Sequence, residues 1–491
     1  MSASGREILH RERSCVRSAV LKQGLQNSAG ALVRLAVSVV TIPFLLRHLG
    51  LSDSGLWFWI QAVVALICSV ESALATTATV FLSRETSGAG TSSRLTVALV
   101  SAVFLGVALA GALWLFATPV SLLAGDLSSR DSGHVVRAVG VSSLVVLARI
   151  LQTPFTAMQH ARRGFGLWNL LQTAQVVATS LGAVAMAMRT RDLVSLVGWQ
   201  AVMAWLFLGT HAVVAARLWG LTGRRLVWSR THWREMTRYT ADACVGTLGA
   251  VLFAHGDRLV VGPLLGAAPL SVYAAMTTIA SQINTLSATV AQPLLPRISG
   301  PASRDRDEVL ELVAPPLRLS VAAALGLSLG VVAWGPIVMA LFVPRWSEVG
   351  DDTALRLMAL IYGLYSLSAA GYYLLQGMGR IRITGVVILS SGLASLATIW
   401  TGAYYFGLRG AVAGNVSYTG TMVLVALAMR DLGIPVRRWL PWLAEPLLIF
   451  VPGAACAVLS DGHLMLQAGT LLVSLTLLLR WTVAGGRAHA K

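Results

Sequence analysis

Residues 253–273, FAHGDRLVVGPLLGAAPLSVY, place an acid and a base, Asp257 and Arg258, inside an otherwise apolar run. The run closes with a Leu-Gly pair at Leu265, eight residues before a tyrosine. An earlier apolar run closes with the same pair at Leu49, eight residues before a tryptophan. The offset between the two pairs, 265 − 49, is 216, and such a fixed offset indicates an internal repeat.

A second pair of landmarks has nearly the same offset. Gln159, followed by Arg162 and Arg163, ends one apolar segment, and Gln376, followed by Arg380, ends another. The offset between these glutamines, 376 − 159, is 217. Two independent landmarks at one spacing predict that the chain contains two copies of one structural unit.

The composition indicates an integral membrane protein. Of the 491 residues, 56% are hydrophobic and only 12% are charged, and the mean hydropathy is +0.71. A soluble protein of this length could not bury so much apolar side chain. About 20 apolar residues in a helix cross a bilayer. Fourteen such spans are predicted, centred near residues 36, 68, 106, 145, 178, 205, 250, 282, 325, 365, 394, 419, 451 and 473.

Charge placement predicts the topology. With a cytoplasmic N-terminus, 25 of the 38 arginines and lysines fall in cytoplasmic segments, and six fall in outer loops. This asymmetry follows the positive-inside rule, so both termini are expected in the cytoplasm. The net charge of +17 therefore does not indicate nucleic acid as a partner. The first apolar run, 25–46, is too long for a cleaved signal peptide and is expected to remain as a helix.

These features predict an all-α membrane protein with two parallel six-helix lobes and two appended C-terminal helices. A basic cytoplasmic tail is expected at 1–24 and the first lobe at 25–216. A basic cytoplasmic linker at 217–238 leads to the second lobe at 239–430. The extra helices and the cytoplasmic C-terminus occupy 431–491. Because the first copy has an even number of helices, both copies begin on the same side of the membrane. The repeats are therefore parallel.

Charged residues within predicted spans are candidates for function, because they are costly to place in hydrocarbon. Arg34, Glu71 and Arg149 are predicted to lie at one level near the middle of the first lobe, and they are our candidates for binding substrate. An Arg34–Glu71 pair that merely locks two helices is the structural alternative.

In the second lobe, Asp257 and the neighbouring His255 and Arg258 are candidates for ion coupling, because an acid beside a histidine could bind a proton or a cation. A purely local Asp–Arg arrangement is the alternative. His211, the other intramembrane histidine considered, is expected to make a buried polar contact rather than to bind a ligand.

Known enzyme signatures are not found, and no catalytic residue is assigned. The chain has no lysine in a P-loop setting, no GxSxG and no HExxH. Asp305-Arg306-Asp307 spells the DxD triplet of many glycosyltransferases, but a solvated helix start explains it better. The four cysteines are widely separated, which predicts no metal site and no disulfide framework.

The chain resembles the polysaccharide transporters of the multidrug/oligosaccharidyl-lipid/polysaccharide exporter superfamily, and in particular O-antigen-type lipid-linked oligosaccharide flippases. The resemblance covers about residues 20–430. The Q-x-x-x-R turns after the fourth and tenth spans are part of it. Its other elements are PFLLRHLG (43–50), GDRLVVGPLLGAAPLSVYAA (256–275) and QPLLPRIS (292–299). The first copy departs from the second, with Thr41-Ile42 where Asp257-Arg258 would align.

The resemblance implies two lobes around a central cavity that opens alternately to each side. It also implies a flippase that moves undecaprenyl-pyrophosphate-linked oligosaccharide during surface polysaccharide assembly, such as that of O-antigen in lipopolysaccharide, of capsule or of exopolysaccharide. The expected partners are the lipid-linked substrate, the bilayer and a polysaccharide polymerase with its chain-length regulator. No cofactor is expected beyond a proton or sodium gradient. A cation-coupled multidrug exporter is the alternative within the superfamily, and a membrane glycosyltransferase or polymerase is the alternative from another class.

The charge distribution yields a prediction for topology. Reporter fusions after about residue 125 and after residue 348 should report the outer side of the membrane, and fusions within 217–238 should report the cytoplasm, because arginine-rich segments are retained inside. Fusion reporters active on only one side of the membrane measure this. A cytoplasmic signal at residue 348 would contradict the parallel repeat.

Overall fold

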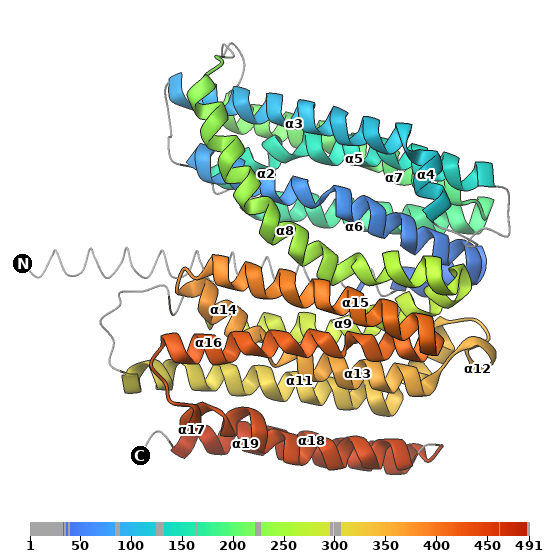
Figure 1. Ribbon diagram of the computed structural model, residues 1–491, viewed down its shortest axis with the longest axis vertical. Coiled ribbons are helices and arrows are strands. Elements are labelled where there is room, and N and C mark those ends of the chain that lie inside the picture. Colours follow the sequence, from blue (N-terminus) through green and yellow to red (C-terminus); the bar gives the residue numbers. More distant parts are fainter. Residues whose placement is uncertain are drawn as a thin grey trace, which may run out of the picture. The chain divides into compact units, whose positions relative to one another are not determined.

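The computed structural model shows an all-helical chain (Figure 1). It describes residues 40–83, 89–123, 132–162, 165–220, 227–294, 306–460 and 462–488, with isolated residues at 33, 36, 37 and 298. Within these ranges there is no β-strand. A membrane interior explains this, because a helix satisfies its own backbone hydrogen bonds where no water is present. The predicted all-α membrane fold is confirmed.

Eleven helical runs of the described chain are long and apolar enough to cross a membrane. Two of them are unusually long, Val40–Ser83 with 44 residues and Ile381–Asp431 with 51. Ile381–Asp431 contains the two spans predicted near residues 394 and 419, whereas Val40–Ser83 contains the span predicted near residue 68 and only the end of the one predicted near residue 36. Each run also contains a glycine with positive φ, Gly50 at 82° and Gly407 at 59°, where the chain changes direction. The predicted span near residue 282 corresponds to a further helix that is not among the eleven.

The chain divides into two compact units by its internal contacts. Unit 1 comprises Met1–Leu49, Ile67–Leu122 and Arg130–Cys244, and unit 2 comprises Gly50–Leu66, Leu123–Ser129 and Val245–Lys491. The predicted lobe boundaries at residues 216 and 239 stay predictions. Two helical runs are shared, since both Val40–Ser83 and Arg230–Leu265 contain residues of both units.

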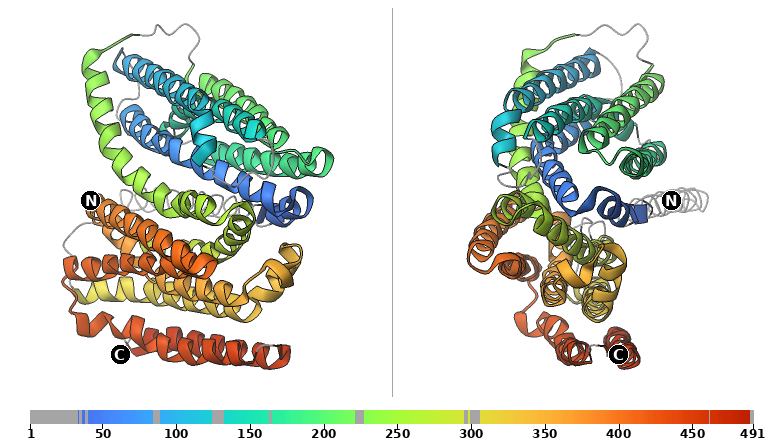
Figure 2. Two further views of the ribbon diagram at one scale, coloured as in Figure 1. Left: turned by 45° about the vertical axis from the view of Figure 1, so that its right-hand side comes forward. Right: turned by 90° about the vertical axis from the view of Figure 1, so that its right-hand side faces the viewer.

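Unit 1 is built around α5, which packs against α2, α3, α6 and α7 (Figure 2). A cluster of buried apolar side chains, including Phe81, Met158 and Trp219, fills one end of this bundle. The helices are α2 (Ser69–Ser83), α3 (Ala89–Leu115), α4 (Ala117–Leu123), α5 (Ser132–Ala161), α6 (Phe165–Thr190) and α7 (Leu193–Trp219), followed by the shared α8 (Arg230–Leu265).

Unit 2 contains a second helical bundle and adds a C-terminal hairpin. Its core forms where α9, α11 and α13 pack together, and α18 and α19 lie along α11 (Figure 1). The elements are α9 (Ala267–Ala291), α11 (Arg306–Phe342), α12 (Trp346–Val349), α13 (Asp352–Ser366), α14 (Ala369–Gly377), α15 (Ile381–Gly414), η2 (Asn415–Met422), α16 (Val423–Asp431), α17 (Val436–Trp439), α18 (Pro441–Leu459) and α19 (Leu464–Ala488).

The C-terminal hairpin is held to α11 by a cation between two indole rings. The Arg318 guanidinium lies 5.3 Å from the ring centroid of Trp442 and 5.6 Å from that of Trp481. The Trp481 indole N–H donates to Glu445 Oε2 at 2.9 Å. Arg318 itself is 8% exposed. The two appended helices are therefore packed against unit 2 through cation–π contacts as well as apolar side chains.

Backbone geometry supports the repeat that the sequence indicates. Gly50 and Gly266 both have positive φ, at 82° and 94°, and the offset between them, 266 − 50, equals that of the two Leu-Gly pairs. Arg191 and Gly407 also have positive φ, at 51° and 59°, and have the same offset (407 − 191). A left-handed residue at equivalent points in both copies ends one helix and starts the next.

Gly55 permits a close approach between the shared helical run and α9. A Cβ at this position would overlap with the carbonyl oxygen of Ala267 within unit 2. Gly55→Ala is therefore expected to lower stability by about 1–3 kcal/mol, because a backbone atom cannot move aside as a side chain can. Gly469→Ala in α19, where a Cβ would meet no atom within 4 Å, is the matched control and should be near neutral. The apparent melting temperature of the purified protein measures both, and equal values would contradict the predicted close contact.

Candidate functional site

Two of the three predicted substrate-binding residues meet in unit 1. Glu71 lies in the first turn of α2, and Arg149 lies in the middle of α5. The Arg149 Nε atom is 3.0 Å from Glu71 Oε2, which makes an ion pair between the two helices. The side chains are 42% and 25% exposed, respectively. Because Arg149 keeps so much exposed surface, its guanidinium has donors that remain available for a second partner.

Arg34, the third predicted substrate-binding residue, lies outside the described residues. The structure therefore does not address the alternative pairing of Arg34 with Glu71. Glu71 has Arg149 as its partner within the described part of the chain. This pairing places a positive and a negative charge side by side between α2 and α5 of unit 1.

The ion pair is one part of a polar strip along α5. Gln152 follows Arg149 by one turn, and its amide donates to Gln175 Oε1 of α6 at 3.2 Å. Two turns further on, the Gln159 amide contacts Nδ1 of His211 on α7 at 3.0 Å. Gln159 and His211 are both fully buried. His211 is thus a buried polar contact, as the sequence predicts, and the strip links α5 to three neighbouring helices.

In unit 2, Asp257 is the central acidic residue. It lies in α8 and is 1% exposed. Its Oδ1 accepts the backbone N–H of Arg258 at 2.8 Å. Its Oδ2 is buried and accepts no hydrogen bond that meets ordinary geometry among the described residues. A charged carboxylate without a partner is costly at a buried position, so this side chain is suited to binding a proton or a cation.

Tyrosine side chains surround Asp257. The Tyr273 hydroxyl lies near the carboxyl group and accepts a 2.9 Å hydrogen bond from Nδ2 of Asn415. Tyr362 and Tyr418 complete the surroundings, with ring centroids 6.0 Å apart. The Tyr418 hydroxyl donates to the backbone carbonyl of Phe253 at 3.0 Å. These rings are fixed by α8, α9, α13 and η2 together.

The sequence reasoning missed the tyrosines and Asn415, although one signal was present for Tyr273. Gly266 turns the chain between α8 and α9. Asp257 precedes this turn by nine residues and Tyr273 follows it by seven, so a helical hairpin brings them to one level. No comparable signal exists for Asn415, which lies far from Tyr273 in the sequence.

The two other predicted ion-coupling residues have different surroundings. The Arg258 guanidinium lies 5.5 Å from the ring centroid of Phe58, also in unit 2. Among the described residues it makes no ion pair with Asp257. His255 is half-buried in α8, two residues before Asp257. The structure thus brings Asp257 together with tyrosine side chains, while the Arg258 guanidinium lies over the ring of Phe58.

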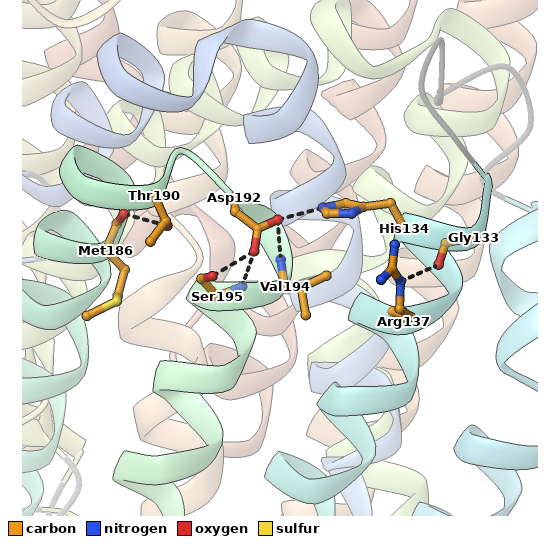
Figure 3. A network of polar contacts seen from close by, with 8 residues as sticks. All are labelled: Gly133, His134, Arg137, Met186, Thr190, Asp192, Val194 and Ser195. Carbon is orange, nitrogen blue, oxygen red and sulfur yellow. Dashed lines mark hydrogen bonds and ion pairs between the residues drawn. The ribbon is translucent and has the colours of Figure 1, made fainter.

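A second polar network lies at the start of α7 in unit 1 (Figure 3). Asp192 caps the helix, accepting hydrogen bonds from the Ser195 backbone N–H at 2.9 Å and its hydroxyl at 2.7 Å. His134 Nε2 lies 2.6 Å from the same carboxylate. Partial burial by itself raises the pKa of Asp192. The hydrogen bonds from Ser195 and the neighbouring His134 together lower the pKa by more than burial raises it, so the net shift is downward.

This network does not have the geometry of a catalytic triad. The Ser195 hydroxyl donates to Asp192 and not to His134, so the serine has no adjacent base to activate it. Its role is to close the turn at Arg191 and to start α7. No cluster of three or more potential metal ligands occurs among the described residues.

The fold and these intramembrane charges define a multi-pass α-helical membrane protein. The chain belongs to the polysaccharide biosynthesis protein family, whose sequence profile matches residues 58–351. Comparison with curated proteins finds no match in sequence.

Solved structures share the fold at low sequence identity. A lipid II flippase, MurJ, in an inward closed conformation matches with a TM-score of 0.76 at 12% identity, covering 93% of this chain and 98% of that one. An inward-facing multidrug resistance MATE family transporter of the MOP superfamily matches with a TM-score of 0.60 at 15% identity, over 82% and 98%. A MOP superfamily transporter from Pyrococcus furiosus, described as having a binding pocket of reverse polarity, matches with a TM-score of 0.51 at 16% identity, over 84% and 96%. The chain therefore shares its fold with this flippase and these transporters.

Proposed function

We propose that this protein flips an undecaprenyl-pyrophosphate-linked oligosaccharide from the inner to the outer leaflet of the bacterial cytoplasmic membrane. The two lobes would expose a cavity to each side in turn, while the lipid tail stays in the bilayer. The product would pass to a polysaccharide polymerase and its chain-length regulator in assembly of O-antigen, capsule or exopolysaccharide. Membership in the polysaccharide biosynthesis family and the fold shared with a lipid II flippase support this proposal.

The observation that carries the proposal is the half-exposed Arg149 in the middle of the membrane-spanning helix α5. A pyrophosphate linked to sugars cannot cross hydrocarbon unaided, so the path needs a cation at depth. A guanidinium binds phosphate oxygens with two parallel hydrogen bonds. Glu71 contacts Arg149 through Nε, at 3.0 Å, so the terminal nitrogens remain available to an anion. Glu71 would thus hold the arginine in place between substrates.

A cation-coupled multidrug exporter is the second candidate, and the shared fold with MATE transporters favours it. A cationic drug requires surplus acid along its path, whereas Glu71 is already neutralised by Arg149 in unit 1. Asp257, the acid of unit 2, is 1% exposed. A glycosyltransferase or polymerase is the third candidate, and incorporation of labelled sugar by the purified chain would support it instead.

Removing the Arg149 guanidinium should strongly lower the rate of flipping. Arg149→Ala is expected to lower the rate about ten- to hundredfold, because each hydrogen bond to a charged group contributes about 1.5–3 kcal/mol. Arg149→Lys should keep an intermediate rate, since it retains the charge and loses the two-pronged geometry. Flipping of lipid-linked oligosaccharide into the outer leaflet of reconstituted liposomes measures the rate, with protein abundance determined alongside.

The double variant Glu71→Ala, Arg149→Ala separates substrate binding from structural pairing. If the pair only joins α2 to α5, removing both charges leaves no buried charge without a partner and should restore the rate. If Arg149 binds pyrophosphate, the double variant stays inactive at normal abundance. Arg34 is proposed as a second phosphate ligand, and Arg34→Ala should show the same loss. A fully active double variant would refute the role of Arg149.

Asp257 is proposed as the ion-coupling residue, with a proton or a sodium ion as the coupling ion. Asp257→Asn keeps the shape of the side chain and removes its charge and its titration. We expect slower transport and loss of the response to an imposed proton or sodium gradient, since no group of changing charge remains at Oδ2. Initial rates in proteoliposomes with each gradient applied separately provide the measurement.

Tyr273→Phe is the matched variant for this experiment. It removes the hydroxyl group beside Asp257 and keeps the ring, so packing in unit 2 is retained. Its gradient response should be weakened and not lost, because the carboxyl group remains. Unchanged transport and an unchanged gradient response in Asp257→Asn would leave Asp257 with a structural role only.

A further inference from the structure

The first part of α8 extends beyond the length needed to cross a bilayer. The helix has 36 residues, Arg230–Leu265. At 1.5 Å per residue this is about 54 Å, whereas the hydrocarbon core is about 30 Å thick. The apolar residues begin near Ala243. The preceding turns therefore lie at the level of the lipid headgroups or beyond it.

Three arginines form a stripe on this extension. Arg230, Arg234 and Arg238 follow one another at intervals of four residues, which places them on one face of the helix. All three are exposed, and none makes an ion pair within the described ranges. The opposite face carries the buried Met236 and Thr240. Thr240 donates a 3.0 Å hydrogen bond to Thr77 of α2, so the extension is fixed to unit 1 and its arginines point away.

The arginine stripe continues along the same helix as an exposed apolar stripe. Val245 and Leu248 are 52% and 39% exposed. They follow Arg238 by seven and ten residues, which returns them to the same face of α8. The arginines thus extend an exposed face of α8 toward the level of the headgroups, and the 51% exposed Trp228 precedes Arg230 by two residues.

We propose that the arginine stripe, defined as Arg230, Arg234 and Arg238, binds the phosphate groups of anionic phospholipids in the adjacent leaflet. Guanidinium groups bind phosphate oxygens in pairs, and an indole ring prefers the membrane interface. Glu235 and Asp242 are the acids of this extension, and neither makes an ion pair within the described ranges. The stripe thus keeps all three cations available for lipid.

This inference goes beyond the proposed function, because the binding of membrane lipid does not depend on the cargo. Bound lipid would fix the depth in the membrane of the N-terminal part of α8, which belongs to unit 1. The remainder of α8, from Val245, belongs to unit 2. Anionic lipid would therefore hold one end of the helix that connects the units. The positive-inside rule by itself would explain these arginines only through the orientation of the helix during insertion, whereas the proposal gives them a role in the folded protein.

The test is lipid binding by the full-length protein in nanodiscs and vesicles of defined composition. The probe is phosphatidylglycerol in a phosphatidylcholine background, with bound lipid counted by native mass spectrometry and affinity obtained by titration. Each arginine near an anionic surface strengthens binding about fivefold. The triple variant Arg230→Gln, Arg234→Gln, Arg238→Gln should therefore weaken binding of phosphatidylglycerol on the order of a hundredfold. The wild-type preference should also fall steeply with added salt.

Two further variants control for position and for folding. Arg230→Lys, Arg234→Lys, Arg238→Lys keeps the charges and should retain most of the preference. The pair Arg430→Gln, Arg437→Gln, on α16 and α17 of unit 2, removes charge elsewhere and should bind phosphatidylglycerol as the wild type does. Undiminished binding by the triple glutamine variant would overturn the proposal. An equal loss of phosphatidylglycerol binding in the control pair would also overturn it, because the effect would then depend on net charge and not on the position of the arginines.

Discussion

The membrane interior has no water to satisfy backbone N–H and C=O groups, and the architecture of this protein depends on that constraint. Every described segment at membrane depth is helical, so the chain reverses only where a helix ends. Gly50, Gly266 and Gly407 supply the left-handed conformation at such points. These turns recur at one constant offset, 50 to 266 and 191 to 407, which agrees with the repeat that the sequence predicts.

The same constraint governs the charged side chains, and the two units satisfy it in different ways. Unit 1 places Arg149 against Glu71, so that each charge compensates the other. Unit 2 encloses Asp257 among tyrosine side chains, with no cation bonded to its Oδ2 among the described residues. An ion pair with an exposed arginine suits an anionic substrate, whereas a lone enclosed acid suits a small cation or a proton. The two units therefore hold intramembrane charge in two chemically different environments.

Much of this organisation is predictable from sequence because it depends on local pattern. Apolar run length predicts the spans, and Leu-Gly pairs at Leu49 and Leu265 predict the reversals. The charged residues Glu71, Arg149 and Asp257 are recognisable as candidates because charge is rare within such runs. The turn at Arg191 was not recognisable as a repeat landmark, because its equivalent, Gly407, is a different residue with the same sign of φ.

The sequence by itself determined the membrane class, the helical periodicity, the repeat and the set of buried charges, since each follows from the order of apolar and polar residues along one chain. Only the tertiary structure decided which charge meets which. Glu71 of α2 pairs with Arg149 of α5, and Asn415 of η2 reaches Tyr273 of α9. Such contacts depend on how helices are rotated and which of them are neighbours. The rotation of each helix about its axis is set by the packing of many side chains at once, and the spacing of residues along the chain does not predict it.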